Sequence, residues 1–348
     1  MMVGERPALR LLGAGLVCLD IINMDGKVQY YNGGSCGNVA SGLSFLGWKN
    51  AVLTGRYKDE AAKILNCNFE RLGVQKIEVK HGNSVTPRII EEFSNGQQKA
   101  HHFSMVCPQC GRELPRLSSF DDKSVCSLEL SDFNVFYSDR TSKGIVLLRN
   151  LYKDKGAWTV YEPNSSRNVK SLLTNAIDSH IVKFSADKVS MTLADMIRNQ
   201  STNGATVLIV RTMGKEGLAY SYRKRDNTMS LWKHLDVQPV PHFVDSCGAG
   251  DWCTTGILYS LVNKHPSFTK YLTNQDVVAS LQYGQALSAI SCCFLGAQGL
   301  IYADVSEDIE KNLLGSRGRL FANQLNPADP PGNLSANYCD FCLLEREL

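Results

Sequence analysis

Residues 243–256 read FVDSCGAGDWCTTG, and the order of residue types in this stretch constrains both the fold and the chemistry. Gly248, Ala249 and Gly250 let the backbone turn so that successive N–H groups converge, and a helix-like apolar pattern begins directly after them. The first N–H groups of a helix, together with its dipole, favour a bound anion. The stretch therefore predicts an anion hole formed by these three residues at the start of a helix.

Asp251 follows this predicted anion hole directly, although a negative charge beside a bound anion would ordinarily be repelled. A carboxylate there suits a reaction in which a substrate hydroxyl loses its proton while it attacks a phosphoryl group. Asp251 would accept the proton, and the N–H groups would hold the phosphate oxygens. The purely structural alternative is a glycine-rich turn in which the aspartate only caps the start of a helix.

Apolar runs of strand length alternate along the chain with helical patterns, which is typical of βαβ units. The segments are NAVLTG (50–55), EAAKILNCNFERLG (60–73), FNVFYSD (133–139), SKGIVLLRNLYKDKG (142–156), AWTVYEP (157–163) and SHIVKFS (179–185). LLGAGLVCLDII (11–22) is interpreted as the first buried strand, with Asp20 at its end. We expect a mainly parallel central sheet with helices on both faces.

Two segments interrupt this alternation. KVQYYN (27–32) alternates in the manner of a strand, and RIIEEF (88–93) followed by Asn95-Gly96 and QKAHHFSMV (98–106) predicts a β-hairpin. Together they would form a small second sheet. Such a sheet can cover the carboxyl ends of parallel strands, where open α/β folds bind ligands.

Composition excludes several other classes of protein. The chain has 348 residues, 43% of them hydrophobic, and a net charge of +3 without a basic run, so neither nucleic acid nor a membrane surface is an expected partner. No apolar run reaches the ~20 residues that a membrane-spanning helix needs. We expect a cytoplasmic protein, in which the 12 cysteines are thiols or metal ligands rather than disulfides. A P-loop motif is absent from the sequence, and a glycine fingerprint for dinucleotides is incomplete.

Five motifs in order resemble the signatures of the ribokinase-like (phosphofructokinase-B type) family of carbohydrate kinases. VDSCGAGD (244–251) is similar to the family's D-T-x-G-A-G-D segment. The other four are GGSCGNVASGLSFLG (33–47), EPNSSR (162–167), TMGKEG (212–217) and ALSAISCCFLGA (286–297). Because they occur in the family's order, they are far more specific together than any one alone.

The resemblance implies a ribokinase-like three-layer sandwich with a central mainly parallel sheet plus a small β lid, in one kinase domain over 1–320. It implies ATP and Mg²⁺ as cofactors and a homodimer formed through the lid. It assigns the base to Asp251, substrate binding to Asp20, Gly34 and Asn38, and nucleotide binding to Asn164, Thr212, Gly214 and Gly217. A capping role is the structural alternative for Asp20 and Asn38.

The sequence departs from the family pattern near the expected metal site. Glu162 stands where the family usually has Asp, and Ser185 and Lys188 replace the family's Asn and Mg²⁺-associated Glu, with Asp187 one position early. We therefore expect Mg²⁺ to be handled differently in this protein.

A second candidate site is a cysteine pair in CPQCGREL (107–114). A Cys-Pro-x-Cys-Gly turn aims two thiolates at one point, which is typical of half a zinc site. CDFC (339–342) would supply the other half, so Cys107, Cys110, Cys339 and Cys342 would hold a structural Zn²⁺ in an element made of 107–118 and 333–348. The alternative is four unrelated thiols.

The sequence therefore predicts a kinase that transfers the γ-phosphate of ATP to a hydroxymethyl group of a small sugar or sugar-like molecule. A nucleoside kinase is the alternative among enzymes. A sugar or nucleotide sensor with a zinc-fastened tail is the alternative outside enzymes, and Asp251 argues against it, because a sensor needs no base beside an anion hole.

Overall fold

The computed structural model of the protein describes residues 8–24, 27–79, 85–93, 103–107, 110–117 and 119–303. Within these residues, the larger of two sheets has nine strands. Their order is β13 (Lys233–Leu235), β12 (Leu218–Tyr222), β11 (Leu208–Thr212), β10 (Ile181–Ser185), β9 (Trp158–Tyr161), β8 (Val135–Ser138), β1 (Leu11–Gly13), β4 (Ala51–Gly55) and β5 (Gln75–Val79). Only β12 runs opposite to the other strands, because it pairs antiparallel with both β11 and β13, so the expected mainly parallel sheet is confirmed.

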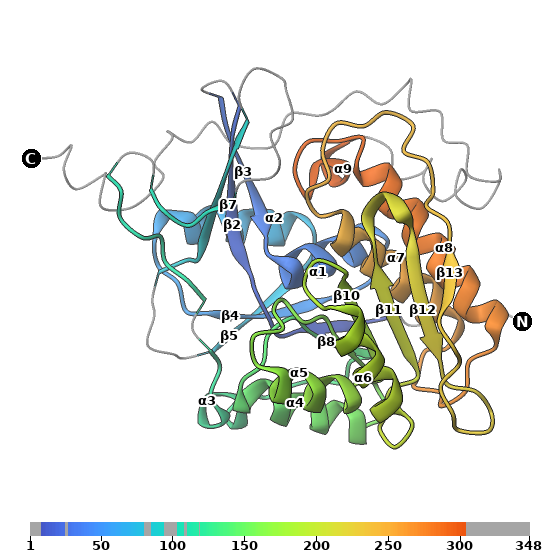
Figure 1. Cartoon of the computed structure of the whole chain (residues 1–348). Helices are drawn as coiled ribbons and strands as arrows, with labels where there is room; N and C mark the ends of the chain where they lie inside the picture. The colour runs from blue at the N-terminus through green and yellow to red at the C-terminus, as the bar shows by residue number, and fades with distance from the viewer. Residues whose placement is uncertain are drawn as a thin grey trace, which may run out of the picture.

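Helices cover both faces of this sheet (Figure 1). One face carries α1 (Ser35–Phe45), α2 (Glu60–Arg71), α7 (Ala249–Lys264) and α8 (Asn274–Ser291), and the other carries α3 (Asp122–Cys126), α4 (Lys143–Asp154), α5 (Val169–Ile177) and α6 (Met191–Ser201). The side chains of consecutive strand residues point to opposite faces of the sheet. Leu208 packs in the core under α7 and α8, and Ile209 packs in the core under α5 and α6. The short η1 (Gly214–Glu216) and α9 (Gly299–Tyr302) follow β11 and α8.

A second sheet, here called the lid sheet, stands off the large one (Figure 1). Its strands, in order, are β3 (Lys27–Gly33), β2 (Cys18–Met24), β6 (Arg88–Phe93) and β7 (Phe103–Ser104). One face packs Leu19, Tyr30 and Ile90 against Ala61 of α2. The opposite face carries Asp20 and Ile22. β6 and β7 pair antiparallel, and the predicted Asn95-Gly96 turn between them lies outside the described residues.

The expectation of a single first strand over 11–22 is wrong. The chain forms β1, leaves the large sheet through Ala14–Val17, and enters the lid sheet as β2. Gly15 lies in the crossing, where a Cβ atom would stand 1.7 Å from Asp139 Oδ1, so the backbone passes directly against that carboxylate. Asp20 is therefore the third residue of the second strand rather than the end of the first.

A buried ion pair joins the lid sheet to the main body. Arg88 Nη2 of β6 lies 2.7 Å from Asp59 Oδ2, and both side chains are almost fully buried. Asp59 also caps α2 by accepting from the Ala62 N–H, and it accepts from the Thr86 N–H. The base of the lid sheet is therefore tied to the first turn of α2.

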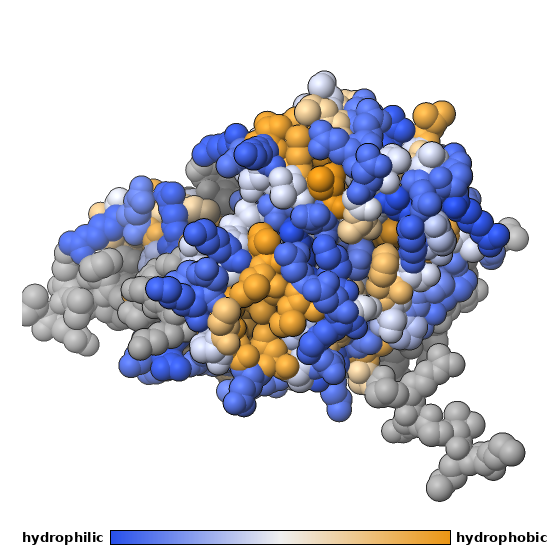
Figure 2. Space-filling model, turned by 90° about the horizontal axis from the view of Figure 1, so that it is seen from below, coloured by the Kyte–Doolittle hydropathy of each residue, from blue (hydrophilic) through white to orange (hydrophobic). Residues whose placement is uncertain are grey.

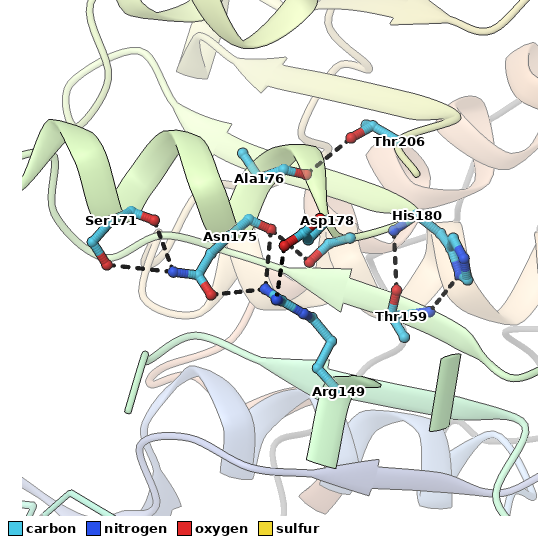
Figure 3. A network of polar contacts seen from close by, with 9 residues as sticks. Arg149, Thr159, Ser171, Asn175, Ala176, Asp178, His180 and Thr206 are labelled. Atoms are coloured by element: carbon cyan, nitrogen blue, oxygen red, sulfur yellow. Dashed lines mark hydrogen bonds and ion pairs between the residues drawn. The ribbon is translucent and has the colours of Figure 1, made fainter. Parts of the chain in front are cut away.

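A polar network lies between α4, α5 and the strands β9 and β10 (Figure 3). Arg149 Nη1 donates to Asn175 Oδ1 at 2.7 Å, and Arg149 Nη2 lies 3.3 Å from Asp178 Oδ2. His180 Nδ1 accepts from the Thr159 N–H at 3.1 Å, and burial lowers the pKa of His180 to about 3. The imidazole is thus neutral, and the network is part of the packing between sheet and helices.

The molecule seen from below shows apolar surface among hydrophilic side chains (Figure 2). Leu147 and Leu151, one turn apart on α4, are about two-fifths exposed, and Val169, Met191 and Met196 are also exposed on α5 and α6.

No helix in the part of the chain that the structure describes combines the length and apolar character needed to cross a bilayer.

Candidate active site

Asp251 lies in the first turn of α7, and the turn before it is formed as the sequence suggested. Gly248 is the N-cap residue with φ of 71°, a left-handed conformation that glycine adopts without strain. A Cβ atom at Gly248 would lie 2.6 Å from Ala297 Cβ, so close packing also requires glycine there. The first N–H groups of α7 have no acceptor within the helix, and Asp251 belongs to the same first turn; of these groups, the Ala249 N–H donates to the Ser246 carbonyl at 3.2 Å.

Asn38 contacts Asp251 directly, although 213 residues separate them. The Asn38 Nδ2 atom donates to Asp251 Oδ2 at 2.7 Å, and the Ser35 hydroxyl also hydrogen-bonds Asp251. Both donors come from the first turn of α1, which begins after the N-cap residue Gly34. Asn38 is therefore not a helix cap, and it presents an N–H₂ group to the carboxylate.

The surroundings of Asp251 disfavour its charge. Burial is the main cause, and the negative charge of Glu162 adds to it, so the pKa of Asp251 is raised above its ordinary value. Asn38, Lys183 and Ser35 act in the opposite direction. A carboxylate whose pKa is raised is a stronger proton acceptor once it is ionised.

Asp20 also belongs to this region, as an acid on the lid sheet. Its pKa is raised to about 7 by burial, with the charges of Glu91 and Asp251 adding to the effect, while the Cys18 thiol that donates to it lowers it. Gly33 on β3 makes room for the carboxyl group, because a Cβ there would stand 2.0 Å from Asp20 Cγ. A glycine in the Gly-Gly motif thus leaves space for an acid on the neighbouring strand.

A buried lysine that the sequence analysis did not single out lies at the same end of α7. Lys183 on β10 forms an ion pair with Glu162, which follows β9, and both side chains are mostly buried. Burial opposes the charge of Lys183, but the Glu162 carboxylate raises the pKa of Lys183 above its usual value. A Cβ at Gly250 would lie 3.8 Å from Lys183 Nζ, so the ammonium reaches the first turn of α7. The signal in the sequence was a lysine inside an otherwise apolar strand, IVKFS.

Glu162 makes further contacts that bear on the expected Mg²⁺ site. Its Oε2 accepts from Thr254 Oγ1 at 2.8 Å and from Tyr137 OH at 3.2 Å, and its Oε1 faces Lys183. Both carboxylate oxygens are therefore engaged within the protein. This arrangement does not fit a role for Glu162 as a metal ligand, since a cation already neutralises it.

Asp139 is a second acid that was not assigned a role from the sequence. It follows β8, accepts from the Leu16 N–H at 2.8 Å, and lies 2.8 Å from Arg140 Nη1. Burial raises the pKa of Asp139 to about 6, against the opposing effect of Arg140. Asp139, Glu162 and Lys183 come from neighbouring strands, so this edge of the sheet gathers ionisable groups.

The residues expected to bind nucleotide lie at the next strand in the sheet. Thr212 ends β11, Gly214 is the first residue of η1 with φ of 56°, and Gly217 follows η1 with φ of 83°. A Cβ at Gly217 would lie 2.2 Å from the Leu235 carbonyl oxygen, so glycine is needed where β13 passes. Asn164 is exposed, two residues beyond Glu162.

The KFSADKVS segment (183–190) begins within β10 and turns directly after Ser185. The Ser185 hydroxyl accepts from the Asp187 N–H at 3.1 Å, and Asp187 and Lys188 are exposed. An exposed carboxylate can contact a hydrated Mg²⁺ that arrives with nucleotide phosphates. Asp187 is therefore the carboxylate of residues 183–190 that could contact such a Mg²⁺ ion.

The cysteine element is described only in part. Cys107 is buried among the apolar residues under the lid sheet, and the Gly111 N–H donates to the Cys107 carbonyl at 2.9 Å. Cys339 and Cys342 lie outside the described residues. A different group of side chains could hold a metal ion in the part of the chain that the structure describes. It consists of Glu91, Asp245 and Cys247, whose potential ligand atoms all lie within 4.8 Å of one another. Both Asp245 oxygens accept backbone N–H groups, from Cys247 and Gly296.

This combination of a mainly parallel sheet, a lid sheet and a glycine-capped α7 defines the ribokinase-like α/β fold. Ribokinase from Giardia lamblia superposes with a TM-score of 0.70 at 11% identity, over 89% of this chain and 100% of that chain. Aminoimidazole riboside kinase from Salmonella enterica, solved with aminoimidazole riboside and an ATP analog, gives 0.65 at 15% identity, over 87% and 99%. Fructokinase from Xylella fastidiosa with bound ATP gives 0.62 at 20% identity, over 83% and 93%.

The sequence itself matches the pfkB family carbohydrate kinase model over residues 171–302. The predicted resemblance is thereby confirmed, and the match includes Asp251, Lys183 and the η1 segment. The comparison with curated protein sequences gives no match. The family match supports a kinase, and the structural neighbours support the ribokinase-like fold.

Proposed function

We propose that the protein is an ATP-dependent kinase that phosphorylates a hydroxymethyl group of a small sugar or sugar-like substrate. The observation that carries this proposal is the Asp251 carboxylate, held by Asn38 at 2.7 Å and belonging to the same first turn of α7 as the helix N–H groups. A proton acceptor and an anion hole can act on the same reaction only if they are close to each other.

In the proposed reaction, the substrate hydroxyl oxygen attacks the γ-phosphorus and its proton passes to Asp251. The bond from the γ-phosphorus to its bridging oxygen breaks, and ADP leaves with that electron pair. The N–H groups at Gly248, Ala249 and Gly250 would bind the γ-phosphate oxygens as their charge grows. Lys183, close to Gly250, would add a positive charge that is already oriented by Glu162.

The substrate would bind between the lid sheet and α1. Asp20, Asn38 and the Gly34 backbone would hydrogen-bond its hydroxyl groups, since donors and acceptors that converge favour a polyol. Thr212, Gly214 and Gly217 would line the nucleotide, with Asn164 near its phosphates. Mg²⁺ would neutralise those phosphates when bound. Glu162 is already paired with Lys183. Asp187, which is exposed in the turn after β10, is therefore the carboxylate that could reach a hydrated Mg²⁺ ion.

A nucleoside kinase remains the second candidate. It is favoured by neighbours that act on nucleoside-like substrates: adenosine kinase from Sinorhizobium meliloti has a TM-score of 0.61 at 16% identity, in addition to aminoimidazole riboside kinase. The ribose hydroxyls of a nucleoside would engage Asp20 and Asn38 as those of a free sugar would. A sensor without catalysis is disfavoured, because it would gain nothing from the raised pKa of Asp251.

A structural zinc ion, a homodimer and a cytoplasmic location are also part of the proposal. Zn²⁺ on Cys107, Cys110, Cys339 and Cys342 would fasten the C-terminal segment 333–348 to the region beside the lid sheet. A homodimer through the lid sheet and a cytoplasmic location are further expectations.

The direct test is ATP consumption against a panel of sugars and nucleosides. Asp251→Asn should lower kcat by about 10²–10⁴ on any accepted substrate while ATP still binds. Asp276→Asn is a matched control, because Asp276 occupies the same first-turn position of α8, is buried, and belongs to a capping box. Full activity in Asp251→Asn, or no ATP-dependent transfer to any acceptor, would contradict the proposal.

A further inference from the structure

Gln298 lies close to the candidate base Asp251 and belongs to none of the five sequence motifs. It precedes α9, is fully buried, and its Nε2 donates to Asn38 Oδ1 at 3.3 Å. Asn38 in turn donates through Nδ2 to Asp251 Oδ2. Two amides and a carboxylate therefore form one chain that joins the α9 segment, α1 and α7.

The direction of the hydrogen bonds in this chain is set by chemistry. An asparagine side chain has one oxygen that only accepts and one N–H₂ group that only donates. If the Asn38 amide turned over, its oxygen would face the ionised Asp251 carboxylate, and two acceptors would repel each other. The donor from Gln298 favours the observed orientation, because it engages the Asn38 oxygen and leaves the N–H₂ group for Asp251.

We infer that Gln298 is a positioning residue that acts through Asn38, holding the Asn38 N–H₂ group toward the Asp251 carboxylate. This inference rests on the proposed function only in taking Asp251 as the base. Gln298 Oε1 is buried and has no hydrogen-bond donor among the described residues. A buried oxygen of this kind needs a donor, and a substrate hydroxyl or an ordered water would supply one.

The backbone around Gln298 is held in place independently of its side chain. Trp252 Nε1 donates to the Ala297 carbonyl at 2.8 Å, and Gly248 packs against Ala297. A substitution of the Gln298 side chain should therefore leave the loop in position. Gln298→Met is the appropriate variant, since it keeps the length of the side chain and removes both polar atoms.

The first experiment is a double-mutant cycle on transfer to an accepted sugar or nucleoside. Gln298→Met should lower kcat about tenfold or more, and should add little to the loss already caused by Asn38→Ala. Gln285→Met is the matched control, because Gln285 is another buried glutamine with an oxygen that has no described donor, within α8. Equal effects of the two Gln→Met variants, or additivity with Asn38→Ala, would overturn the inference.

The second experiment does not depend on activity. Carbon-13 NMR of the aspartate carboxyl groups would follow the Asp251 titration, assigned by its loss in Asp251→Asn. Since Asn38 lowers the pKa of Asp251, Gln298→Met should move the Asp251 titration to higher pH. Gln298→Glu should move it further, because its carboxylate would draw the Asn38 N–H₂ group away from Asp251.

Several groups besides Asn38 influence this titration, and all are unchanged in Gln298→Met. They are Asp20 on β2, Cys36 on α1, Tyr137 on β8, Asp139 after β8, Glu162 after β9, Lys183 on β10 and Cys247 before α7. An Asp251 titration that stays in place in both Gln298 variants would overturn the inference. A shifted titration in a protein that phosphorylates no acceptor would retain the inference and contradict the proposed function.

Discussion

Lys183 and Glu162 form an ion pair between two neighbouring parallel strands, at the edge of the sheet that faces the start of α7. The pair is mostly buried, so each charge depends on the other for its stability. It also brings an ammonium group close to Gly250, in the predicted anion hole. The pair thus links the stability of the sheet to the charge available at the candidate active site.

Lys183→Met should reduce both stability and activity. Removing the lysine leaves Glu162 buried without its cation, so the free energy of unfolding should fall by about 3–5 kcal/mol. Loss of the positive charge near the phosphate should lower kcat/KM by about 100-fold. Urea unfolding and the transfer assay measure the two effects.

Two further variants separate these effects. Lys183→Met with Glu162→Gln should recover much of the stability and little of the activity, because the orphaned charge is gone but the ammonium is still missing. Lys188→Met, which changes an exposed lysine in the same segment, should leave the free energy of unfolding nearly unchanged. An active Lys183→Met enzyme would exclude a role for the ammonium in transfer.

Gly33→Ala should weaken substrate binding. The new Cβ would stand 2.0 Å from the Asp20 carboxyl group, which must then move. Overpacking of this kind costs about 1–3 kcal/mol, so KM for the sugar should rise about tenfold while KM for ATP changes little. Gly37→Ala is the control, because the nearest atoms to a Cβ at Gly37 are 3.9 Å away. Equal KM values in the two variants would contradict a role for Asp20 in the substrate site.

His180 should contribute a loss of stability in acid. The native pKa of His180 is about 3, below its ordinary value of 6.5, so the unfolded state binds a proton that the native state does not. The contribution of His180 to the free energy of unfolding should therefore fall as the pH drops from about 6.5 toward 3, by up to about 1.4 kcal/mol per pH unit, while the raised pKa values of Asp20 and Asp139 act in the opposite direction. Urea unfolding of the wild type and of His180→Gln at pH 5 and pH 7 isolates this contribution as the difference between the two proteins.

His180→Gln should lose this contribution, since glutamine can accept from the Thr159 N–H and does not titrate, so its stability relative to the wild type should be higher at pH 5 than at pH 7. His234→Gln, which changes a histidine whose side chain is half exposed, is the control. A difference in stability between the wild type and His180→Gln that is the same at pH 5 and pH 7 would contradict a lowered pKa of His180.

Native mass spectrometry should find one Zn²⁺ per chain. Cys107→Ser and Cys339→Ser should each lose the ion, because a structural site with four thiolates needs every ligand. Cys67→Ser changes an exposed cysteine on α2 and should keep it. A native protein without zinc would leave the four cysteines as unrelated thiols.

Much of the fold could be predicted from local patterns. Strands such as Trp158–Tyr161 and helices such as Glu60–Arg71 fall within segments whose apolar period is plain in the sequence. The first strand was predicted wrongly because 11–22 is apolar almost throughout. The two glycines at 13 and 15 were the local signal for a break, but the change of sheet over 13–17 also depends on how closely Gly15 approaches Asp139, which the sequence does not show.

The sequence by itself determined the glycine-capped start of α7, with Asp251 in its first turn, because a helix start depends on residues that are adjacent in the chain. Only the tertiary structure decided which side chains meet that carboxylate. Asn38 contacts Asp251, Gln298 contacts Asn38, and Lys183 lies close to Gly250. All three are far from Asp251 in sequence, and they come together because α1, the α9 segment and β10 converge at the carboxyl ends of the parallel strands. Burial among these groups, rather than residue type, then sets the pKa of Asp251.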